Sequence, residues 1–148
     1  MEPDIVQSAI NALSENLGNS GESFKSRIAA SNYFRLKLGE KKVETFAVMY
    51  LDARFRFIEF DEVATGGVDQ TSANPRAIAL KAIENCARFV ILGHNHPSGD
   101  CEPSNNDVSS TNRMTNALEL FDIQVLDHFV IGRAPGFPCW SIGLGEKL

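Results

Sequence analysis

The first part of the chain has two segments in which apolar residues recur on one helical face. The first spans residues 5–17 and is followed by Gly18, and the second spans residues 24–38 and is followed by Gly39. Glycine directly after such a pattern is a common stop signal for a helix. We therefore expect two core-packing helices, which form an N-terminal helical extension over residues 1–39.

Beyond this extension the pattern changes to short apolar runs that are typical of strands. Such runs predict strands at residues 46–51, 55–60, 88–93, 124–131 and 139–142. Helical spacing predicts a helix over residues 75–86 behind an Asn74 N-cap, and another that begins at Ser104. Helices before, between and after strands predict an α/β domain over residues 40–148, with a mixed β-sheet flanked by helices.

Each of the two later helices has one apolar stripe that should face the core. The first stripe consists of Ile78, Ala79, Ala82, Ile83 and Cys86, and the second of Val108, Thr111, Leu118 and Phe121, with Met114 beside it.

Composition and charge narrow the class of protein. The chain has 148 residues, of which 43% are hydrophobic and 22% charged, so it is neither disordered nor fibrous. A net charge of −5 disfavours phosphate backbones, and we expect weak or no direct binding of nucleic acid. Three cysteines without a C-x-x-C pair favour a reducing, cytoplasmic location. No apolar run approaches the ~20 residues of a membrane span, so no membrane partner is expected.

Two histidines and one aspartate have the spacing of a metal site. His94 and His96 follow a predicted strand, and residues two apart in an extended chain point to the same side. Asp107 lies in the first turn of the next predicted helix, where the loop between them can fold back. Two imidazoles and one carboxylate suit Zn²⁺ and leave a fourth position for water.

The same segment also has a simpler interpretation. Histidines in a loop rich in proline and glycine can be ordinary exposed polar residues. Ser104 and Asp107 fit the N-cap and third position of a helix, where a carboxylate is favoured by the helix dipole. Capping and metal binding are compatible, because the cap can orient the turn that carries the ligand. Cys101, inside the loop, is a further candidate ligand.

Two segments, GHNHPSGD at residues 93–100 and VLDHFVIG at residues 125–132, resemble the RadC family. The His-x-His, seven residues, Ser, two residues, Asp pattern is also that of the JAMM metalloprotease motif, called JAB or MPN-plus. The resemblance covers roughly residues 42–142 and implies a JAB/MPN fold, which is cytidine-deaminase-like. The chain resembles the short RadC form, because residues 1–40 show no helix-hairpin-helix pattern.

The resemblance implies a role for each site residue. His94, His96 and Asp107 would bind Zn²⁺, Glu44 would act as the general base, and Ser104 would stabilise the oxyanion. The latter two would be the catalytic residues. Glu40, Glu59 and Glu62 are weaker candidates for the base, because they do not occupy the motif position.

Asp127 and His128 have two open interpretations. They could orient a metal ligand from behind the site, or they could form an ordinary charged pair on a strand. His128 as an additional zinc ligand is disfavoured, because the motif is already complete.

The resemblance implies a zinc-dependent hydrolase that cleaves a peptide or isopeptide bond with a metal-activated water, acting on a peptide or protein substrate. The alternative is a DNA-repair-associated RadC-like protein that acts through DNA or protein binding rather than proteolysis. A zinc nucleobase deaminase is disfavoured because its H-x-E and P-C-x-x-C signature is missing. His94-Asn95-His96 is not an HNH nuclease site, which is a spaced ββα-metal unit rather than a tripeptide.

Overall fold

The computed structural model describes residues 26–66, 73–133 and 135–148. The strands are β1 (Thr45–Leu51), β2 (Phe57–Thr65), β3 (Phe89–His96), β4 (Gln124–Gly132), β5 (Cys139–Ser141) and β6 (Glu146–Lys147). The helices are α2 (Arg27–Leu38), α3 (Pro75–Glu84) and α4 (Asn105–Glu119). The helix expected over residues 5–17 lies outside the described residues.

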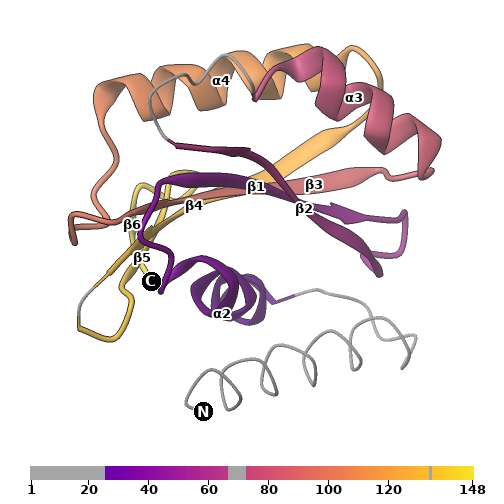
Figure 1. Ribbon diagram of the computed structural model, residues 1–148. Coiled ribbons are helices and arrows are strands. Elements are labelled where there is room, and N and C mark those ends of the chain that lie inside the picture. The colour runs from indigo at the N-terminus through magenta and orange to yellow at the C-terminus, as the bar shows by residue number, and fades with distance from the viewer. Residues whose placement is uncertain (1–25, 67–72, 134) are drawn as a thin grey trace.

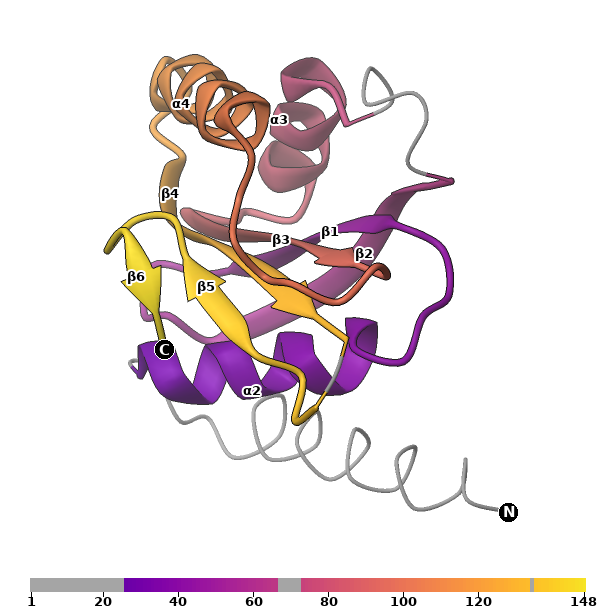
Figure 2. The ribbon, with the colours of Figure 1, turned by 90° about the vertical axis from the view of Figure 1, so that its left-hand side faces the viewer.

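These strands form one mixed sheet in the order β2-β1-β3-β4-β5-β6. Strands β3 and β4 are parallel, with α4 as their connection, and the other neighbouring pairs are antiparallel. Helices α3 and α4 cover one face of the sheet, and α2 covers the other (Figures 1 and 2). The predicted α/β class, with a mixed β-sheet flanked by helices, is confirmed.

Helix α2 begins after Ser26, whose side chain accepts a hydrogen bond from the backbone N–H of Ala29. It contributes Tyr33 and Phe34 to the core cluster on its face of the sheet, as expected for a core-packing helix. The Phe34 ring lies against Gly93 of β3, where a Cβ atom would overlap it. The absence of a side chain at this position therefore allows α2 to approach the sheet closely.

The turn between β1 and β2 is longer than expected. The Asp52 carboxylate accepts hydrogen bonds from the backbone N–H groups of Arg54 and Arg56, at 2.8 and 2.9 Å. Phe55 adopts a positive φ of 62° inside this turn. Strand β2 consequently starts at Phe57, two residues later than the apolar pattern suggests.

Strand β3 is longer than expected at its end. The prediction stopped at Gly93, whereas pairing with β4 continues to His96, which lies opposite Gly132. Val90 and Leu92 belong to the core cluster under α3 and α4. Since side chains alternate along a strand, His94 and His96 lie on this same face.

The apolar stripes of α3 and α4 are narrower than predicted. Ile78, Ala79, Ala82, Thr111, Met114 and Leu118 are buried as expected. Ile83, Phe121 and Val108 are 53%, 54% and 38% exposed, and Cys86 is also exposed. Phe121 and Cys86 lie beyond the ends of their helices, so helical spacing does not place them against the sheet. Within the described ranges, no helix has the length and apolar character needed to cross a bilayer.

Candidate metal centre

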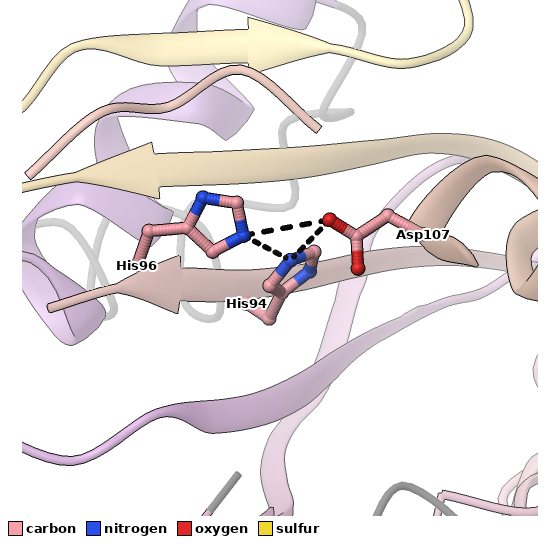
Figure 3. Close-up of side chains that lie close together, drawn as sticks. All are labelled: His94, His96 and Asp107. Atoms are coloured by element: carbon pink, nitrogen blue, oxygen red, sulfur yellow. Dashed lines mark hydrogen bonds and ion pairs between the residues drawn. The ribbon is translucent and has the colours of Figure 1, made fainter. Parts of the chain in front are cut away.

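Three potential ligand atoms converge at the end of β3 and the start of α4 (Figure 3). The Nε2 atoms of His94 and His96 are 3.1 Å apart, and each lies 3.4 Å from Oδ2 of Asp107. Ligand atoms about 2.0 Å from a tetrahedral zinc ion are separated by about 3.3 Å. The spacing of these three atoms therefore fits three corners of a tetrahedral site.

The hydrogen bond on the far side of the His96 ring determines which nitrogen faces the cluster. Its Nδ1 lies 2.9 Å from the backbone carbonyl oxygen of Asp100, which can only accept. Nδ1 therefore carries the ring proton, and Nε2 presents its lone pair to Asp107 and His94. A lone pair and a carboxylate oxygen that converge in this way need a proton or a metal ion between them.

The electrostatics of the cluster support this conclusion. The hydrogen bond with Asp107 raises the pKa of His96 above its ordinary value, against the opposing effect of burial. Burial by itself would raise the pKa of Asp107, but hydrogen bonds with His94 and His96 outweigh it and hold that pKa well below its usual range. Asp107 is therefore an anion, which suits a metal ligand.

The cap of α4 orients the Asp107 carboxylate. The Ser104 side chain accepts a hydrogen bond from the Asp107 backbone N–H at 3.0 Å. In return, the Ser104 backbone N–H donates to Oδ2 of Asp107 at 2.9 Å. This reciprocal capping box fixes the oxygen that also faces the two histidines. Capping and ligand placement, which the sequence leaves compatible, occur together.

The loop from residue 97 to 104 is fixed against the end of β4. The backbone N–H of Arg133 donates to the Gly99 carbonyl oxygen at 2.9 Å. A Cβ atom on Gly132 would overlap the same oxygen, so the contact requires glycine there. Cys101 is buried in this loop but does not belong to the cluster, and burial raises the pKa of its thiol.

Glu44 lies beside the cluster but is not one of the three converging groups. It directly precedes β1 and lines a cavity of about 380 Å³ together with His94 and Asp107. Its charge contributes to the raised pKa of His96, so it acts electrostatically on the cluster. The apolar part of the cavity wall consists of Phe46, Ala64, Ala73, Pro75, Leu92 and Met114.

None of the three weaker glutamate candidates lines the cavity, and two of them form ion pairs with lysines. Glu59 pairs with Lys81 at 2.7 Å, and Glu62 pairs with Lys41 at 3.2 Å. Neither glutamate lines the cavity, and Glu40 does not line it either.

Asp127 and His128 have separate roles. The Asp127 carboxylate accepts hydrogen bonds from Arg27 of α2 at 2.7 Å and from the Ser141 hydroxyl at 2.6 Å. It therefore connects α2 and β5 rather than contacting the cluster. Nε2 of His128 lies 2.7 Å from Nδ1 of His94, so this imidazole supports the cluster from behind. Burial lowers the pKa of His128 well below its ordinary value, which keeps the ring neutral.

Two residues near the cluster were not identified from the sequence as site residues. Thr111, expected only as part of an apolar stripe, places its hydroxyl 2.6 Å from Nδ1 of His128. Asn95, between the two histidines, is buried and hydrogen-bonded to the segment that carries Glu44. Two features of the sequence could have identified these residues. Thr111 lies one helical turn after Asp107, and Asn95 is a polar residue in a buried strand, where its side chain needs hydrogen-bond partners.

Comparison with known proteins identifies the family of this chain. The family model described as the RadC-like JAB domain matches residues 24–142. The chain belongs to the RadC-like JAB domain family. The match includes all three converging residues of this RadC-like JAB domain, together with Glu44 and Ser104.

Individual relatives are UPF0758 proteins. The RadC-like JAB domain is 45% identical over 112 residues to a UPF0758 protein of Xanthomonas oryzae pv. oryzae, which is 76% of this chain and 50% of that protein. It is 44% identical over 127 residues to a UPF0758 protein of Aromatoleum aromaticum, which is 86% of this chain and 56% of that protein. The chain thus spans about half the length of the curated relatives it matches.

Proposed function

We propose that this RadC-like JAB domain is a zinc-dependent hydrolase that cleaves a peptide or isopeptide bond. The observation that carries the proposal is the convergence of His94 Nε2, His96 Nε2 and Asp107 Oδ2 at separations of 3.1–3.4 Å. This donor set leaves a fourth position open, as in catalytic rather than structural zinc sites. The adjoining cavity of about 380 Å³ supplies room for a substrate group.

The ligand set would hold Zn²⁺, which supplies a bound water with a pKa lowered to about 7. Glu44 would accept a proton from the attacking water and deliver it to the leaving amine. Its half-buried position at the cavity, outside the ligand set, supports this role. The net result is hydrolysis of an amide without a covalent enzyme intermediate.

Ser104 would stabilise the oxyanion. Its hydroxyl oxygen already accepts a hydrogen bond from the Asp107 backbone, which leaves the hydroxyl hydrogen available to donate. The side chain belongs to an exposed residue at the start of α4, so a substrate carbonyl can approach it. A donor aimed at developing negative charge lowers the barrier to acyl transfer.

The partner that we propose is a peptide or protein, and the location is the cytoplasm. Support for the location comes from Cys86, Cys101 and Cys139, which are all free thiols.

Metal analysis and a peptidase screen test the proposal together. Protein purified with zinc supplied should contain about one zinc ion per chain, and His96→Ala should lose it. Asp100→Asn is the matched control, because it changes a carboxylate in the same loop that accepts a hydrogen bond from the Glu102 backbone and does not belong to the cluster. A library of peptides and isopeptide-linked conjugates should be cleaved by the zinc-loaded protein, but not after chelation. A wild type that binds no zinc, or a zinc-loaded protein that cleaves nothing in the library, would contradict the proposal.

A further inference from the structure

A continuous row of buried contacts runs from one metal-facing histidine to the backbone of the metal-facing aspartate. Nδ1 of His94 lies 2.7 Å from Nε2 of His128, and Nδ1 of His128 lies 2.6 Å from the Thr111 hydroxyl oxygen. The Thr111 hydroxyl in turn donates to the Asp107 carbonyl oxygen at 2.8 Å. All four residues are at most 8% exposed.

His94 differs from His96 in the kind of neighbour that determines which ring nitrogen carries the proton. The Nδ1 of His96 faces a backbone carbonyl, which fixes the proton on that nitrogen. The Nδ1 of His94 faces another imidazole, which either donates or accepts. The contact with His128 therefore leaves two arrangements, and only one of them presents a lone pair on His94 Nε2 to the cluster.

Thr111 selects between these arrangements because its hydroxyl has a single hydrogen. When that hydrogen is donated to the Asp107 carbonyl, the Thr111 oxygen must accept from Nδ1 of His128. His128 then accepts at Nε2, so the proton of His94 lies on Nδ1 and its Nε2 is bare. The reversed order would place a proton on His94 Nε2, between the ligand atoms.

We propose that Thr111 and His128 are positioning residues that direct the His94 Nε2 lone pair toward the metal. This inference rests on the proposed metal centre, but it does not depend on which bond the protein cleaves. Phe46 supports it by stacking on His94 at 6.5 Å and 10° and meeting His128 edge-on at 5.6 Å. These ring contacts oppose a flip of the His94 ring, which would place ring carbons where Nδ1 and Nε2 now lie.

Zinc affinity, measured by chelator competition, tests the role of the hydroxyl. Thr111→Val keeps the shape of the side chain but removes its donor and acceptor, and should weaken zinc binding by about 10–100-fold. Thr111→Ser should restore the affinity. The matched control is Thr115→Val, because Thr115 makes the same hydroxyl-to-backbone bond one turn later, at 2.8 Å, without contacting an imidazole. Equal affinity in Thr111→Val and wild type would overturn the inference.

The ring protons can be observed directly, independently of activity. The chain has three histidines, so long-range ¹H–¹⁵N correlation spectra of the metal-free protein above the histidine titration range are readily assigned. We expect protons on Nδ1 of all three rings in the wild type, and a mixture of tautomers at His94 and His128 in Thr111→Val. A proton on Nε2 of His94 in the wild type would overturn the inference even if Thr111→Val failed to fold. A wild type that bound no zinc would instead overturn the metal centre, and this inference with it.

Discussion

The side-chain amide oxygen of Asn95 accepts a hydrogen bond from the backbone N–H of Thr45 at 2.7 Å. The amide nitrogen of Asn95 donates to the carbonyl oxygens of Val43 and Lys41, at 3.2 and 3.3 Å. Asn95 lies between the two histidines, but alternation along β3 places it on the opposite face. It therefore connects the strand that carries the metal-facing histidines to the segment that carries Glu44.

Asn95→Ala should destabilise the protein and release the Glu44 segment. It leaves the buried N–H of Thr45 without a partner, so the free energy of unfolding should fall by about 1–3 kcal/mol. Hydrogen exchange at the Thr45 amide should accelerate, while zinc affinity changes little because neither histidine is altered. Denaturant unfolding and amide exchange measure these effects. The control is Asn85→Ala, which removes a 3.3 Å hydrogen bond to Glu59 away from the cluster, and equal losses in both variants would contradict this role.

Glu44→Gln should retain zinc and lose turnover. The amide keeps the size of the side chain but cannot accept and return a proton, and a general base contributes about 10²–10⁴-fold to the rate. The rate should be measured with a peptide found in the screen, alongside the zinc content. Glu62→Gln removes a carboxylate that pairs with Lys41, and it should remain active. Full activity of Glu44→Gln would assign proton transfer to another residue.

The stability of the metal-free protein should pass through a maximum near pH 6.5, the ordinary histidine pKa. Burial lowers the pKa of His128, so below pH 6.5 the unfolded chain binds more protons and the free energy of unfolding falls as pH falls. The hydrogen bond with Asp107 raises the pKa of His96, so above pH 6.5 the folded chain binds more protons and the free energy of unfolding falls as pH rises.

Denaturant unfolding across this pH range measures both limbs. His128→Gln should flatten the acid limb and His96→Gln the alkaline limb. Added zinc should reverse the alkaline limb, because metal ligands bind in their deprotonated form. A monotonic profile in the metal-free wild type would show that these two histidines do not control stability here.

Duplex DNA should bind weakly, no tighter than about 10⁻⁶ M at physiological salt. The reason is electrostatic, because binding needs lysine or arginine side chains at the phosphates and the net charge is −5. Titration of labelled DNA at two salt concentrations measures the affinity and its salt dependence. Tight binding with a steep salt dependence would favour the DNA-repair alternative over the hydrolase.

Local geometry explains which parts of the site could be predicted from sequence. Short-range spacing places His94 and His96 on the same side of a strand. It also places Asp107 at the third position of a helix. The role of Thr111 could not be predicted in this way, because it depends on His128, which β4 places beside β3. The sequence also predicted too short a strand β3. Pairing with β4, rather than the strand preference of its own residues, extends β3 to His96.

The fold shows the same distinction. Helical spacing correctly identified Ile78 and Leu118 as buried, because both lie on the sides of α3 and α4 that pack in the core cluster against the sheet. It was wrong for Phe121, since α4 ends at Glu119 and the chain turns toward β4. Helix ends depend on how the chain reaches the next strand, which the apolar pattern does not contain.

The contact between the Gly99 carbonyl and the end of β4 affects how much chain entropy is lost when a metal binds. The loop from residue 97 to 104 separates His96 from Asp107, and ordering a flexible backbone costs roughly 1–2 kcal/mol per residue. Because the Arg133 N–H and the bare backbone at Gly132 hold this loop, that entropy is lost during folding. The ligand atoms are thus preorganised, and a cation would enter an assembled site rather than assemble it.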